Sequence, residues 1–292
     1  MGPSPALLQS LSHSRFNVVR ARAALGVGER RSRAKGSGME FADYRDYAPG
    51  DDTRRLDAPL YARTGELFIR EYEVTQQLAV SIFIDASRSM EHGSPSKFDS
   101  ALWLASMLGF VGLAGGDRVQ LAIGAPGGVR WSRGFSGPTA ASHMFAWMRG
   151  ARPDHGVRLG ASLGAFAQNV PMRSLAILIS DFWLEENEGS IHAVAARGAE
   201  IWALHVLAKD EVEPLSAGPM TRLVDSESGE ELLLGIDSQL LSSYRREFEA
   251  FREQLKGSIE AAGGRYLFQA TEDNLEQTVP QRLQSAGLLR HR

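Results

Sequence analysis

Short apolar runs alternate with longer amphipathic stretches from residue 78 to the end of the chain. Residues 78–84 and 175–180 are nearly continuous apolar runs, as expected for strands that are buried on both faces of a sheet. The same pattern predicts further strands at 118–123, 128–131, 200–207 and 265–268, helices at 98–113, 140–148, 159–166, 191–197, 242–262 and 275–284, and a hairpin at 221–234. The sequence therefore predicts an α/β three-layer sandwich, with a mostly parallel central sheet of Rossmann-like topology.

Two segments precede this region. Residues 1–37 form a basic N-terminal arm, in which Leu7 to Val19 could make a short amphipathic helix. The arm either contacts an anionic surface or packs back on the domain as a solvated segment. Residues 38–77 are rich in charged and aromatic side chains, and we expect them to pack on the domain, with an edge strand at 67–72. Residues 78–292 are predicted to form one domain.

Composition narrows the function classes. The 292 residues carry a formal net charge of −3, which gives no argument for a nucleic-acid or anionic-membrane partner. The chain has no cysteine, which excludes disulfides, thiolate metal sites and cysteine nucleophiles. No apolar run reaches the roughly 20 residues of a membrane span, and the first residues lack the features of a signal peptide. We expect a cytoplasmic protein without a membrane span.

Oxygen-bearing side chains follow two of the predicted buried strands. Asp85, Ser87 and Ser89 come after the first strand at two-residue steps, and Asp181 follows the strand at 175–180. The carboxyl ends of parallel strands share one sheet edge, so these side chains are expected to converge there. A carboxylate and hydroxyl set suits Mg²⁺, Mn²⁺ or Ca²⁺. The alternative is that Asp85 caps the turn and the serines bind backbone groups.

At these residues the chain resembles the von Willebrand factor A fold and its metal-ion-dependent adhesion site. In that fold an Asp-x-Ser-x-Ser stretch, a threonine and a second aspartate hold one divalent cation, and the resemblance assigns these roles to Asp85, Ser87, Ser89 and Asp181. The stretch that resembles the threonine loop carries Val157 instead. The resemblance therefore implies a degenerate site for Mg²⁺ or Mn²⁺ that lacks one ligand.

The segment upstream resembles a bacterial family catalogued as "domain of unknown function 58". The resemblance covers roughly residues 20–290 and depends on four closely spaced motifs, at residues 38–41, 44–47, 49–52 and 54–57. The chain departs from the usual family pattern at Ala58, where members carry tryptophan. Because members are often encoded beside MoxR-type AAA+ ATPases, the resemblance implies such an ATPase as a protein partner in chaperone-like assembly or maturation.

Two groups of residues are candidates for partner contacts. The upstream segment carries a charge network around Tyr44 and Tyr47 that forms either a docking surface or a structural clasp; its candidate residues are Arg45, Asp51, Arg54, Arg55 and Asp57. Beside the strand-end motif, apolar side chains border the expected site and either contact a partner or pack under the next helix; these are Met90, Phe182 and Trp183.

Catalytic motifs are weak in this sequence. Gly160 to Gly164 matches the Gly-x-Ser-x-Gly pattern of serine hydrolases, but the match falls at a predicted helix start and not after a strand. Neither a Walker A sequence nor Gly-x-Gly-x-x-Gly occurs. The main hypothesis is a non-catalytic protein-binding module with a degenerate adhesion site. The alternatives are a metal-dependent hydrolase that uses Asp85 and Asp181, and a metal-free structural adaptor.

Overall fold

The computed structural model describes residues 2–18, 39–74, 77–183, 188–214, 221–224, 231–235 and 237–291. They belong to two compact units. The larger unit combines residues 1–25 with residues 78–292, and the smaller one comprises residues 26–77.

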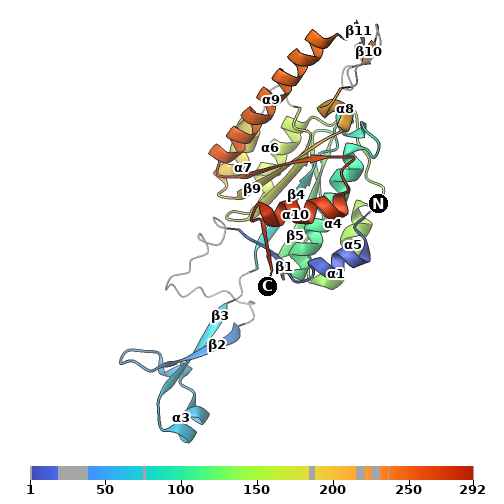
Figure 1. Cartoon of the computed structure of the whole chain (residues 1–292). Helices are drawn as coiled ribbons and strands as arrows, with labels where there is room; N and C mark the ends of the chain where they lie inside the picture. Colours follow the sequence, from blue (N-terminus) through green and yellow to red (C-terminus); the bar gives the residue numbers. More distant parts are fainter. Residues whose placement is uncertain are drawn as a thin grey trace. The chain divides into compact units, whose positions relative to one another are not determined.

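A seven-stranded sheet forms the centre of the larger unit (Figure 1). Its strands run in the order β12-β9-β8-β4-β5-β6, and β7 also pairs with β5. Strands β12, β9, β8, β4 and β5 run parallel to one another, whereas β6 and β7 run antiparallel to β5. The bounds are Ala79–Ile84 for β4, Arg118–Ala125 for β5, Gly128–Trp131 for β6, Phe135–Ser136 for β7, Leu175–Ser180 for β8, Glu200–Leu207 for β9 and Arg265–Ala270 for β12.

Helices cover both faces of the sheet, and each face has its own apolar core (Figure 1). The core on one face takes side chains from α1 (Pro5–Leu11), α4 (Lys97–Ala114), α5 (Ala141–Met148) and α10 (Leu275–Ser285). The core on the other face takes them from α6 (Leu159–Asn169), α7 (Glu188–Ala196) and α9 (Ser238–Ala261). Every residue of β8 and β9 is buried, which explains their mostly apolar sequences. The predicted three-layer α/β architecture is confirmed.

The two ends of the larger unit meet in a short ladder. Strands β1 (Ser14–Phe16) and β13 (Leu289–His291) pair antiparallel, and the ring of Phe16 packs edge-on against that of Trp202 at 5.4 Å. The predicted helix at Leu7 to Val19 is therefore too long, because α1 stops at Leu11 and the chain continues as a strand. Val19 lies outside the described residues.

The smaller unit contains an antiparallel pair, β2 (Met39–Asp46) and β3 (Phe68–Val74). The 3₁₀ turn η1 (Thr53–Arg55) and the helix α3 (Ala58–Thr64) lie between them in the chain. The predicted edge strand is β3, and its partner β2 was not predicted because its sequence mixes charged and aromatic residues without alternation.

Short elements complete the larger unit. They are the 3₁₀ turns η2 (Arg88–Glu91) and η3 (Pro138–Ala140), helix α8 (Lys209–Val212), and the antiparallel strands β10 (Thr221–Val224) and β11 (Glu231–Leu234). The predicted hairpin thus exists as a strand pair, while its expected turn at residues 227–229 lies outside the described residues. Among the described helices only α4 is long and apolar enough to cross a membrane, and 78% of it is buried inside the protein.

Candidate functional site

Asp85 and Asp181 lie at the carboxyl ends of the adjacent strands β4 and β8, as the sequence predicts. The amide of Asp85 donates to the carbonyl of Ile179 at 2.9 Å, and the hydroxyl of Ser180 donates to Asp85 Oδ2 at 2.6 Å. Both aspartates are buried, with 0% and 1% of their surfaces exposed. The two strand ends are therefore bound together directly, through protein groups.

Each oxygen of the Asp85 carboxylate accepts a hydrogen bond from a protein donor. Its Oδ1 accepts from the amide of Ser87 at 2.9 Å, while Oδ2 accepts from Ser180. Burial raises the pKa of Asp85 to about 6, and the charge of Asp181 adds to this, against the opposing effect of the hydrogen bonds from Ser180 and Ser87. Asp85 thus caps the turn that follows β4, which is the structural role considered from the sequence.

Ser87 and Ser89 are also buried, and they bind each other. Their hydroxyl oxygens lie 3.1 Å apart, at the start of η2. The sequence correctly predicts that Asp85, Ser87, Ser89 and Asp181 gather at one sheet edge.

Lys97 is the site residue that the sequence did not reveal. It is the first residue of α4 and is 0% exposed. Its Nζ lies 2.7 Å from Asp181 Oδ2 and 2.6 Å from Glu211 Oε1. Burial alone would lower the pKa of Lys97, but the carboxylates of Asp181 and Glu211 outweigh that effect and raise it above its usual value. A charged ammonium therefore neutralises Asp181 from inside the protein.

Glu211 belongs to α8, a helix of one turn that the sequence did not predict. Its Oε2 accepts from the amide of Ala208 at 2.7 Å, and its backbone carbonyl accepts from the hydroxyl of Tyr244 on α9. These bonds hold the second carboxylate on Lys97. Glu211 lies between Asp210 and Glu213, and nothing in the sequence distinguishes it from these neighbours.

Val157 occupies the place where the resemblance expects threonine, and it is buried. Its loop is joined to the strand-end turn by a hydrogen bond from the amide of Asp154 to the carbonyl of Ala86 at 2.9 Å. Two methyl groups therefore stand where a ligand would be needed. A divalent cation requires several oxygen ligands. With the Asp85 oxygens bonded to protein donors and Asp181 paired with Lys97, the residues as arranged do not fit that ion, and the described residues contain no group of three or more His, Asp or Glu placed to hold a metal.

The three apolar candidates beside the site differ sharply in exposure. Met90 and Phe182 are 0% and 1% exposed, so the interpretation of these two as surface contacts is corrected: their apolar side chains complete the two cores. Trp183 is 40% exposed and stacks on Phe251 of α9, with ring centroids 4.6 Å apart. Phe182 has a φ of +52°, a backbone conformation that costs a non-glycine residue about 1–3 kcal/mol.

The charged candidates of the smaller unit serve its local geometry. Asp57 caps α3 by accepting from the amide of Leu60 at 2.9 Å, and it also accepts from the hydroxyl of Tyr44 at 2.9 Å. Asp51 binds Arg45 at 2.8 Å and the amide of Ala48 at 2.8 Å. These contacts favour the structural clasp, while Arg54 and Arg55 are exposed on η1.

His205 is a further buried ionisable residue near the site. It stands on β9 opposite Ser180 in the sheet register, and its Nδ1 lies 2.7 Å from the hydroxyl of Tyr266. Burial lowers the pKa of His205 to about 3, although the charge of Asp181 opposes the shift. His205 is therefore neutral at physiological pH.

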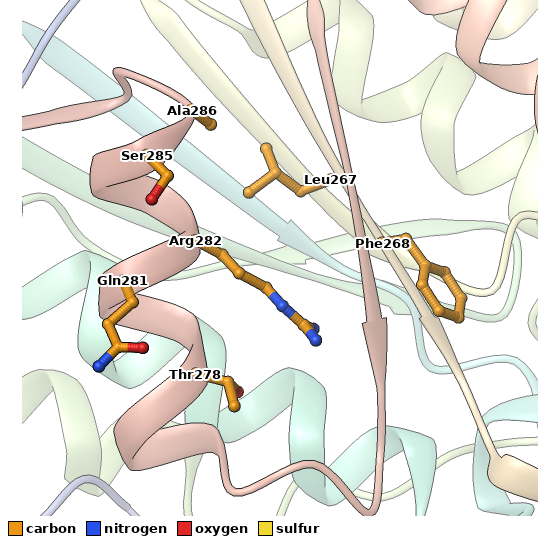
Figure 2. Close-up of a pocket in the computed structure, with 7 residues that line it drawn as sticks. All are labelled: Leu267, Phe268, Thr278, Gln281, Arg282, Ser285 and Ala286. Atoms are coloured by element: carbon orange, nitrogen blue, oxygen red, sulfur yellow. The ribbon is translucent and has the colours of Figure 1, made fainter.

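Two other features lie apart from the strand-end residues. A cavity of about 560 Å³ opens between β12 and α10 (Figure 2) and is lined by none of the predicted site residues. Ser162, the centre of the Gly-x-Ser-x-Gly match, is buried inside α6. It does not stand on the exposed strand-to-helix turn that a hydrolase nucleophile requires.

Comparison with known families gives a match over residues 43–255 to the family described as "Protein of unknown function DUF58". The chain belongs to this family. The match spans all the predicted site residues of this DUF58 protein, in both units. Its relatives include the uncharacterized proteins Rv1480 of Mycobacterium tuberculosis and Mb1516 of Mycobacterium bovis, each 29% identical over 250 residues, which cover 81% of this chain and 76% of theirs.

Solved structures similar to this DUF58 protein include BatB from Bacteroides thetaiotaomicron, at 14% identity and a TM-score of 0.43, covering 72% of this chain and 98% of that one. They also include the SpRpn10 VWA domain, at 12% identity and a TM-score of 0.40, covering 71% of this chain and 95% of that one. The family and the sheet of this protein agree with the von Willebrand factor A-like fold predicted from the sequence.

Proposed function

We propose that this protein is a non-catalytic binding module, and that it binds a protein partner with the surface around the carboxyl ends of β4 and β8. The observation that carries the proposal is Trp183, which directly follows Asp181 and remains 40% exposed although its ring is held against Phe251. Rigid, exposed aromatic side chains supply much of the binding energy at protein interfaces.

Basic side chains border the same edge. Arg88 on η2 is half-buried, and Arg152 is exposed on the loop that the Asp154–Ala86 hydrogen bond ties to the strand-end turn. Guanidinium groups bind carboxylates in a bidentate manner. Arg88 and Arg152 are therefore candidates for contacts with carboxylates of the partner.

The partner we propose is a MoxR-type AAA+ ATPase, with which the module acts in chaperone-like assembly or maturation in the cytoplasm. Support for this partner comes from the family, whose members are often encoded beside such ATPases. The metal-dependent hydrolase considered from the sequence finds no support in the site, because Asp181 is paired with Lys97. Of the hypotheses drawn from the sequence, the metal-free adaptor fits the observed contacts best.

A matched pair of variants tests the surface. Met172, which is 68% exposed, precedes β8, and Trp183 follows it, so Trp183→Ala and Met172→Ala each remove an exposed apolar side chain from opposite ends of one strand. Calorimetric titration against the purified MoxR-type ATPase encoded in the same genome should show binding about tenfold or more weaker for Trp183→Ala and unchanged for Met172→Ala.

The outcomes separate the two parts of the proposal. Wild-type protein that fails to bind the ATPase rules out that partner. Binding that Trp183→Ala leaves intact rules out this surface.

A further inference from the structure

Lys97 stands at an unfavourable place for a cation. It is the first residue of α4, whose N-cap Ser96 accepts from the amide of Asp99. The N-terminal end of a helix carries partial positive charge, which disfavours a cation there. Burial of the ammonium, at 0% exposure, adds a desolvation cost. Lys97 is therefore stable in this position only because its charge is compensated by the surrounding groups.

Two carboxylates provide the compensation, and they come from separate elements. Asp181 follows β8 and Glu211 lies on α8, and each places one oxygen within 2.7 Å of Lys97 Nζ. The remaining oxygen of each carboxylate accepts a backbone amide, from Trp183 at 3.3 Å and from Ala208 at 2.7 Å. The ammonium thus joins α4, α8 and the end of β8 at the edge where Asp85 lies.

The other members of the predicted ligand set leave little for a metal to bind. Asp85 receives hydrogen bonds from Ser87 and Ser180, and the hydroxyls of Ser87 and Ser89 pair with each other. Val157 supplies no ligating atom. A divalent ion at this edge would also meet the positive charge of Lys97.

We propose that the ammonium of Lys97 is the resident cation of this site, so that the sheet edge is assembled without a divalent metal. The lysine supplies one positive charge and two short contacts where an adhesion site would use a metal ion. This inference concerns the unbound chain and does not depend on the proposed partner.

Metal binding by the full-length protein tests the inference. Bound Mn²⁺ is counted by electron paramagnetic resonance, and the thermal unfolding midpoint is measured with Mn²⁺ and with chelator. Wild-type protein should bind no Mn²⁺ at this site, and its midpoint should be the same in both conditions. Lys97→Met should lower the midpoint in chelator and recover part of the loss with Mn²⁺, and adding Val157→Thr should strengthen the recovery. Lys209→Met, which removes an exposed lysine of α8, is the matched control and should behave as wild type.

The inference is overturned if wild-type protein binds one Mn²⁺ per chain and Asp181→Asn abolishes that binding. It is equally overturned if Lys97→Met folds with unchanged stability and gains no affinity for Mn²⁺. Should Lys97→Met fail to fold in either condition, the Mn²⁺ count of the wild-type protein decides the question. A failure of the proposed function would appear separately, as normal metal independence with no binding of the ATPase.

Discussion

The two units of this protein use the same residue types in opposite ways. In the larger unit, Asp85, Asp181 and Lys97 are buried, and each charge depends on a specific partner. In the smaller unit, Arg45 and Asp51 pair at 2.8 Å with their side chains 45% and 24% exposed. Water compensates the exposed pair if it is broken, whereas the buried cluster has no such alternative. Burial, and not the number of charges, therefore decides which network the fold depends on.

The largest contrast should come from removing one cation in each unit. Lys97→Met leaves Asp181 without its buried partner, and the loss of stability expected for such a broken pair is about 3–5 kcal/mol. Arg45→Met should leave hydrogen exchange at the amides of β2 and β3 unchanged. The effect of Lys97→Met is measured by denaturation followed by tryptophan fluorescence, because all five tryptophans lie in the larger unit, between residues 103 and 202. Equal stability of Lys97→Met and wild type would show that the buried cluster matters no more than the exposed pair.

The next largest effect is expected on acidification, which should lower the stability of the larger unit through His205. The pKa of His205 is about 3 in the folded protein, below its ordinary value near 6.5, so the unfolded chain takes up a proton first. Stability is therefore present above pH 6.5 and declines as the pH falls toward 3, by about 2 kcal/mol between pH 7 and pH 5. Asp85 has the opposite effect on stability. Because its pKa is raised to about 6, its ionisation in the folded protein costs stability as the pH rises through that value.

The variant His205→Gln isolates this contribution. Urea denaturation at a series of pH values should show that the stability difference between wild type and His205→Gln shrinks on acidification. A difference that is constant from pH 7 to pH 5 would mean that His205 takes up its proton equally in the folded and unfolded protein, so that folding does not lower its pKa.

The smallest effect is expected in the smaller unit, from Asp57→Ala. This change removes the N-cap of α3 and the acceptor of the Tyr44 hydroxyl, at a cost of about 1–2 kcal/mol. Hydrogen exchange should become faster at the amides of α3, while the amides of β4 and β8 keep their rates. Tyr44→Phe removes only the second contact and should have the weaker effect. If both variants exchange as wild type does, Asp57 is not the residue that fixes this segment.

Much of the fold follows from local sequence pattern. Nearly continuous apolar runs identified β4 and β8, and the positions of Asp85 and Asp181 after these strands predicted that the two acids share one edge. The pairing of β1 with β13 was not predictable in the same way, because it joins residues near opposite ends of the chain. Strand β2 was missed because exposed strands in a small unit lack a regular apolar alternation.

The candidate site was predicted only in part, because the charged residues that compensate one another are far apart in the sequence. Lys97 and Glu211 are 114 positions apart, and no spacing rule connects them. The one available signal was Lys97 itself, a cation at the start of a mostly apolar helix, where the helix dipole opposes it. Met90 and Phe182 show the converse error, since adjacency to a site residue in sequence does not determine whether a side chain faces solvent or core.

Crystals of the wild-type protein grown with excess Mn²⁺ provide the most direct test of the resident lysine cation, through anomalous diffraction at the manganese edge. If Lys97 is the resident cation, no manganese peak appears within ligand distance of Asp85, Ser87 or Asp181, and the Lys97 ammonium contacts Asp181. A manganese peak bonded to Asp181, with Lys97 displaced from it, would contradict the account.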